Sequence, residues 1–201
     1  EMATLNSVQI GDVLQIVGSA FVGVWVAVAW HRYVLLEEVA GPLPPFRGRS
    51  MLAYFVTFFW IFAAVVIIAL LLAFVLVAVV PMQPNSVGRI ASGMIGVLVA
   101  VLGIWLFYRL SPLLPAAALG ETLSIREAWA VTAQISWAVL LAVLIWGLAV
   151  LAIGAVVQFV LTPISFPIGM LASGLLNWAS TMVGISILTT IYGIAVEGRE
   201  I

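Results

Sequence analysis

The chain has 201 residues, of which 65% are hydrophobic and 7% are charged, and its mean hydropathy is +1.30. An ordinary soluble domain carries roughly 25% charged residues, so this chain lacks the polar surface that a water-soluble globule needs. Its formal net charge of −1 excludes a strongly basic nucleic-acid binder. The absence of cysteine excludes disulfides and thiolate metal sites.

The apolar residues come in long runs, several of which exceed the ~18 to 20 residues needed to cross the hydrocarbon core of a bilayer. Stretches such as 65–80 do not alternate apolar with polar residues, as the strands of a membrane β-barrel do. Helices are the remaining way to satisfy the backbone within lipid. The sequence therefore predicts an all-α fold, a polytopic transmembrane helical bundle that forms one domain over residues 1–201.

The apolar runs predict five spans with short connections. Proline and glycine at 41–45 end the first span, residues 81–86 form a turn after the second, and 162–167 form an uncharged turn after the fourth. The five predicted spans cover residues 11–36, 51–80, 90–109, 135–161 and 169–194.

The segment after the third span contains two helix-breaking signals and then a helix start. Pro112 and Pro115 forbid one continuous helix through this segment, because proline lacks an amide donor and restricts the residue before it. Ser124 and Glu127 have the spacing of a capping box, which predicts a new helix. We expect this helix, at 124–134, to lie at the cytoplasmic interface and lead into the fourth span.

The arginines predict the orientation. Five spans place the loop after span one, the segment after span three and the C-terminal tail on one side of the membrane. The positive-inside rule makes the arginine-rich side cytoplasmic, with the C-terminus there and the N-terminus outside. An additional upstream span in a longer parent chain would bring the natural N-terminus into the cytoplasm, so a six-span parent stays open. The arginine-rich side holds Arg32, Arg47, Arg49, Arg109, Arg126 and Arg199, and the other side holds Arg89.

The predicted span interiors carry no clear chemistry. Apart from Asp12, which lies close to a predicted boundary, the Asp, Glu and Arg residues fall at or beyond span ends. Charged groups at membrane depth are costly and signal function. Their scarcity here weakens the case for proton-coupled transport and for intramembrane hydrolysis. His31 is the only histidine, and we expect it to have a structural role at the interface. The sequence therefore predicts no enzyme, with no catalytic residue, metal or cofactor.

Two groups of polar residues are the candidate sites. The first is a set of arginines that we expect to bind anionic lipid headgroups or to dock a partner, although pairing with nearby glutamates is the simpler interpretation. The second lies on spans four and five and forms either interhelical hydrogen bonds or the wall of a polar cavity. The arginines are Arg32, Arg47, Arg49, Arg109 and Arg126, and the second group is Gln158, Asn177, Ser180 and Thr181.

Three segments carry a resemblance to a known group of proteins. They are 28–37 (VAWHRYVLLE), 109–121 (RLSPLLPAAALGE) and 124–132 (SIREAWAVT). Together they resemble a family of uncharacterised inner-membrane proteins of alphaproteobacteria, and more distantly the membrane domain that accompanies some glycerophosphodiester phosphodiesterases. The resemblance implies a bacterial inner-membrane location and a proline-interrupted interfacial segment before span four. It implies no reaction, because no activity is established for that family, and the catalytic phosphodiesterase domain is not present in this sequence.

These observations favour a non-enzymatic membrane protein. We expect an accessory, assembly or lipid-associated component whose partners are the bilayer, anionic phospholipid and other membrane-protein subunits. The alternative is a small transporter or channel for a neutral or lipid-like solute, which would use the polar residues of spans four and five.

Overall fold

The computed structural model describes residues 2–38, 43–79 and 86–199, and within these ranges it contains helices and no strand, which confirms the predicted all-α class. The turn predicted at 81–86 lies outside the described residues except for Ser86, and so do residues 41 and 42 of the predicted 41–45 break. The elements are α1 (Met2–Leu36), α2 (Gly48–Val79), α3 (Ser86–Leu110), α4 (Leu113–Leu119), α5 (Ile125–Val131), α6 (Ser136–Val156), the π-helical turn η1 (Val157–Leu161), α7 (Thr162–Ile164) and α8 (Phe166–Ala195).

Within the described residues, five helical stretches are long and apolar enough to cross a membrane. The chain is therefore a multi-pass integral membrane protein. The five stretches are Gly11–Leu36, Gly48–Val79, Val87–Leu119, Ser136–Ile164 and Phe166–Ala195. Their order matches the five predicted spans, and the third stretch also takes in α4.

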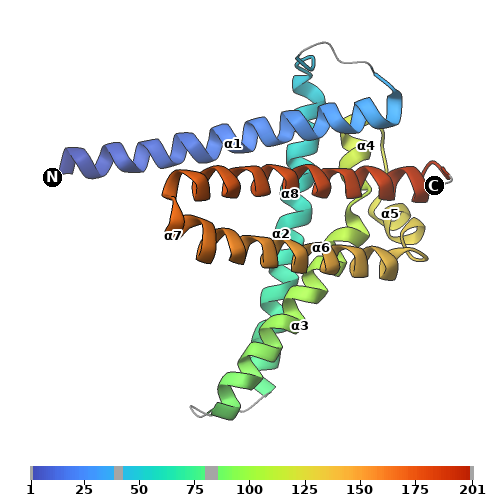
Figure 1. The fold of residues 1–201 in the computed structure, drawn as a ribbon. Coiled ribbons are helices and arrows are strands. Elements are labelled where there is room, and N and C mark those ends of the chain that lie inside the picture. Colours follow the sequence, from blue (N-terminus) through green and yellow to red (C-terminus); the bar gives the residue numbers. More distant parts are fainter. Residues whose placement is uncertain (1, 39–42, 80–85, 200–201) are drawn as a thin grey trace.

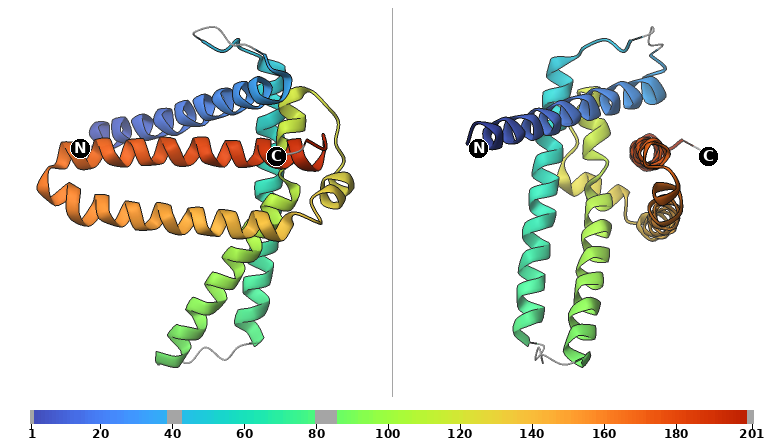
Figure 2. Two further views of the ribbon diagram at one scale, coloured as in Figure 1. Left: turned by 45° about the vertical axis from the view of Figure 1, so that its right-hand side comes forward. Right: turned by 60° about the vertical axis from the view of Figure 1, so that its left-hand side comes forward.

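The long helices run in different directions. α6 and α8 form an antiparallel pair, α1 packs across α8, and α2 and α3 form a separate hairpin (Figure 1). In the right-hand view of Figure 2, α6 and α8 are seen almost end-on while α2 and α3 run lengthwise. No single bilayer normal is parallel to both groups.

The tightly packed part of the protein surrounds α4. Leu114 and Ala118 of α4 are 0% exposed and belong to one buried cluster with Val28 of α1, Tyr54 of α2 and Leu188 of α8. Farther along the helices, most apolar side chains are exposed, as lipid-facing residues are. The core therefore lies where the C-terminal ends of α1, α3 and α8 meet the start of α2.

The proline segment forms a buried helix, which differs from the predicted interfacial segment. α3 ends at Leu110, as the prolines predicted, and the Ser111 hydroxyl donates to the Tyr108 carbonyl at 2.9 Å. Pro115 falls in the first turn of α4, where its missing amide leaves no hydrogen bond unmade. Gly120 then ends α4 with a φ of 83°, a left-handed conformation that glycine adopts without strain.

The predicted capping box is present at the start of α5. The Glu127 amide donates to the Ser124 hydroxyl at 3.2 Å, and the Ser124 amide donates to the Glu127 carboxylate at 2.8 Å. Hydrogen bonds from the Ser124 hydroxyl and amide lower the pKa of Glu127. α5 ends at Val131, short of the predicted 134, and the Thr132 hydroxyl that follows it contacts the Ala128 and Arg109 carbonyls at 2.8 and 3.1 Å.

The connection between the fourth and fifth spans corrects the predicted turn at 162–167. Helical structure continues through η1 and α7, and Ser165 alone is extended between α7 and α8. Pro163 and Pro167 fall in the first turns of α7 and α8, where proline suits a helix start. The two spans therefore form a tight hairpin.

Candidate functional site

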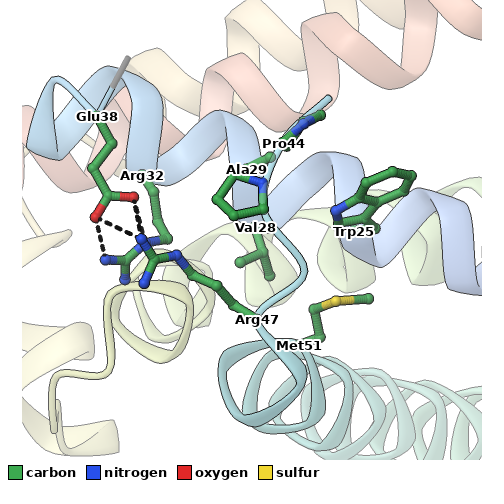
Figure 3. A pocket seen from close by; sticks show the side chains of 9 residues that line it. Trp25, Val28, Ala29, Arg32, Glu38, Pro44, Arg47 and Met51 are labelled. Atoms are coloured by element: carbon green, nitrogen blue, oxygen red, sulfur yellow. Dashed lines mark hydrogen bonds and ion pairs between the residues drawn. The ribbon is translucent and has the colours of Figure 1, made fainter. Parts of the chain in front are cut away.

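Arg32 and Arg47 meet on one carboxylate at the junction of α1 and α2 (Figure 3). Arg32 donates to the two carboxylate oxygens of Glu38 at 2.6 and 3.0 Å, and Arg47 donates to the same oxygens at 3.0 and 3.2 Å. The Arg32 guanidinium also donates to the Ala118 and Leu119 carbonyls at 3.2 and 3.4 Å. It thus links α1 to the negative end of α4.

The local backbone brings Glu38 back to Arg32. Glu37 has a φ of 53°, a left-handed conformation that is uncommon for a residue with a Cβ, and it ends α1 directly before Glu38. Hydrogen bonds from the Arg32 and Arg47 guanidinium groups lower the pKa of Glu38, so this carboxylate stays ionised below its usual range. Two guanidinium groups and one carboxylate leave the cluster with a net positive charge.

A hollow of about 290 Å³ opens beside this cluster. Its wall is cationic at one end and apolar at the other, since Trp25 and Met51 lie opposite the arginines (Figure 3). Hydrogen-bond donors outnumber acceptors among the lining side chains, because Glu38 is the one carboxylate there. The lining residues are Trp25, Val28, Ala29, Arg32, Glu38, Pro44, Pro45, Arg47 and Met51.

Of the five candidate arginines, the structure brings Arg32 and Arg47 together and leaves the other three apart. Arg49 and Arg126 are exposed and do not line this hollow. Arg109 lies before the first turn of α4, whereas Arg32 contacts its last turn, so these two do not share a site. The interpretation of glutamate pairing therefore holds for Arg32 and Arg47 and not for Arg109.

Arg109 is buried against tryptophan. Its guanidinium carbon lies 4.2 Å from the ring centroid of Trp129 and 5.7 Å from that of Trp105, which is cation–π geometry. Its Nε and Nη1 atoms are buried without a hydrogen-bond partner among the described residues. The Thr132 hydroxyl donates to the Arg109 carbonyl, and this hydrogen bond links the end of α5 to the end of α3.

His31 is 0% exposed and lies in the helix junction, deeper than the interfacial position predicted for it. The Thr189 hydroxyl of α8 lies 2.9 Å from the Ile185 carbonyl and 2.8 Å from His31 Nδ1. The hydroxyl and the imidazole therefore share a buried hydrogen bond. The imidazole Nε2 has no partner within the described part of the chain, and the ring of Tyr54 lies 5.6 Å away.

Two further contacts tie the end of α8 to its neighbours. The Tyr192 hydroxyl donates to the Glu121 carboxylate, directly after α4. Arg199 donates to the Leu35 carbonyl at 2.7 Å and to the Val34 carbonyl at 3.3 Å at the end of α1. Sequence reasoning missed both contacts, because nothing in the local pattern links residues so far apart.

The four polar candidates on spans four and five divide into two groups. Asn177 and Thr181 line a hollow of about 440 Å³ with residues of α1, whereas Gln158 is exposed in η1 and does not line it. The Ser180 hydroxyl donates to the Leu176 carbonyl at 2.7 Å, and the Thr181 hydroxyl donates to the Asn177 carbonyl at 2.9 Å. These two hydroxyls are satisfied within their own helix.

The hollow beside Arg32 and Arg47 offers positive charge at one end and an apolar wall at the other. Within the part of the chain that the structure describes, no group of three or more His, Asp or Glu side chains could hold a metal ion. Comparisons with protein-family models, with curated proteins and with solved structures found no match. The resemblance carried by 28–37, 109–121 and 124–132 therefore stays a prediction.

Proposed function

We propose that this chain is a non-enzymatic protein of the bacterial inner membrane that binds an anionic phospholipid, with its arginine-rich side and C-terminus in the cytoplasm. The observation that carries the proposal is the hollow at Arg32, Glu38 and Arg47, which is cationic at one end and apolar at the other. It lies between the end of α1 and the start of α2, two of the helical stretches that are long and apolar enough to cross a membrane. In this role the protein is an accessory or assembly component.

The chemistry of the cluster suits a phosphate. Arginine binds phosphate through paired, charge-assisted hydrogen bonds, and the Arg47 side chain is 41% exposed and so accessible to a headgroup. Trp25 and Met51 offer an apolar surface to the adjoining glycerol backbone. A small transporter for a neutral or lipid-like solute is the second candidate, and the hollow bordered by Asn177 and Thr181 is the observation that favours it.

We expect Arg47→Gln to lower the retention of phosphatidylglycerol about tenfold, because one charge-assisted contact contributes roughly 1.5 kcal/mol or more. Arg49→Gln is the matched control, since Arg49 is exposed near the same helix start and does not line the hollow. Native mass spectrometry of the detergent-solubilised protein measures retention. Equal retention in the Arg47 variant and the wild type would remove the proposed site.

We expect Glu38→Gln to raise phosphatidylglycerol retention several-fold, because Glu38 occupies the guanidinium donors that a phosphate would use. Lowering the pH should have the same direction of effect. Glu38 has a lowered pKa, so its competition persists until the pH falls below the usual carboxyl range and then ceases. Native mass spectrometry, repeated over a range of pH values, measures phosphatidylglycerol retention for both changes. Reduced retention in Glu38→Gln would mean that the carboxylate shapes the site instead of competing for it.

A further inference from the structure

The cationic hollow is the first of three hollows that follow α1. A second hollow of about 190 Å³ shares Ala29 and Pro44 with the first. It shares Val26 in turn with the third hollow of about 440 Å³, which lies between α1 and α8. Each hollow therefore shares at least one wall residue with the next.

One face of α1 runs through all three. Arg32, Ala29, Val26, Val22 and Gly18 follow one another at intervals of three and four residues, which places them on one side of a helix. At 1.5 Å per residue, this face is about 21 Å long. Half of a bilayer hydrocarbon core is about 15 Å, so this length is enough to reach from the headgroups to the middle of a bilayer.

Along this face the lining changes from charged residues to interfacial aromatic residues and then to open space. A phospholipid changes in the same order, from its phosphate through the interfacial region to its acyl chains. Arg32 and Arg47 border the first hollow, and Trp30 and Tyr33, residue types typical of the membrane interface, border the second. In the third hollow, a Cβ added at Gly18 would meet no atom within 4 Å. Space is therefore open where an acyl chain would lie.

We infer that this face of α1 holds a whole anionic phospholipid, with its phosphate at Arg32 and Arg47 and one acyl chain lying along α1 as far as Gly18. The inference rests on the proposed function and adds recognition of the lipid tail. Charge complementarity at one end and the continuity of the three hollows identify the occupant. Asn177 and Ser19 border the far end from opposite helices. The competing occupant, which the test distinguishes, is a second copy of the chain.

The test compares dioleoyl with dioctanoyl phosphatidylglycerol, which share a headgroup and differ in chain length. We expect Gly18→Leu to fill the third hollow and to lower the preference for the long-chain lipid about tenfold, equivalent to the loss of about two buried methylenes. Gly23 lines the same hollow, so Gly23→Leu should lower the long-chain preference in the same way. Gly93→Leu on α3 is the matched control, because its added side chain also meets open space and lies outside this hollow. Native mass spectrometry gives both lipid retention and oligomeric state.

Each outcome decides between the two proposals. Loss of chain-length preference in the Gly18 and Gly23 variants, with Gly93→Leu unchanged, supports the acyl-chain track. An unchanged preference in both variants overturns the track and leaves headgroup binding standing if Arg47→Gln still lowers retention. No effect of Arg47→Gln would overturn the proposed function, and the track with it. A doubled mass that Gly18→Leu abolishes, without a change in chain preference, would identify a second copy as the occupant.

Discussion

Replacing Gly169 with alanine is expected to destabilise the protein by roughly 2 to 3 kcal/mol, because it overpacks the hairpin between η1 and α8. A Cβ at this position would lie 2.4 Å from Thr162 Oγ1 and 2.7 Å from Thr162 Cα. Rotation of the threonine side chain relieves the first contact and not the second, which involves backbone. The hairpin would have to open, and the midpoint of thermal unfolding in detergent should fall.

The matched control for this prediction is Gly174→Ala on the same helix. A Cβ at Gly174 meets nothing within 4 Å, so alanine there should be neutral or slightly stabilising, as it is within most helices. Adding Thr162→Ala to Gly169→Ala removes the contact with Oγ1 and should restore part of the stability. The rescue should be incomplete, because the contact with the Thr162 backbone remains. Equal unfolding midpoints for the Gly169 and Gly174 variants would show that the hairpin is not close-packed.

The spans were predictable because lipid imposes a simple rule on sequence. An apolar run of sufficient length has one stable structure in a bilayer, and the five predicted spans correspond in order to the five helical stretches. The chain does reverse within 162–167, as predicted, but the segment is helical apart from Ser165, for a local reason. Two prolines suggested a turn, yet each falls in the first turn of a helix, where proline is tolerated.

The short helix α4 was not predicted. Seven residues are too few to show a helical period, and a proline within them argues against a helix when the sequence is read alone. Its stability comes from burial against α1, α2 and α8, which is a tertiary effect. The packed junction around α4 is therefore the part of the fold that the apolar pattern does not reveal.

The candidate site was predicted in composition and not in detail. Charge at span ends identified the arginines, but the pairing of Arg32 and Arg47 depends on Glu38, which a left-handed Glu37 places within reach. Arg109 has the same residue type and a similar position at a span end. It packs on Trp129 because α5 folds back against α3, a contact that neither local sequence contains.

The contact between His31 and Thr189 leads to a prediction about stability. Thr189→Val preserves shape but leaves His31 Nδ1 without its hydrogen-bond partner, in an imidazole whose Nε2 has no partner among the described residues. A buried polar group left in this way costs roughly 1 to 3 kcal/mol. Thr190→Val is the control, because the exposed Thr190 hydroxyl bonds only the Ser186 carbonyl of its own helix, and we expect a loss of about 0.5 kcal/mol or less.

A double-mutant cycle tests the reason for this effect. His31→Leu removes the ring nitrogen together with its need for a partner, and the Thr189 hydroxyl can still bond the Ile185 carbonyl, so this change should be milder than Thr189→Val. The double variant should then lose less stability than the two single losses added together, by roughly 0.5 kcal/mol or more. Unfolding midpoints in detergent measure all four proteins. Simple additivity would contradict the contact, because two residues joined by a buried hydrogen bond cannot act independently.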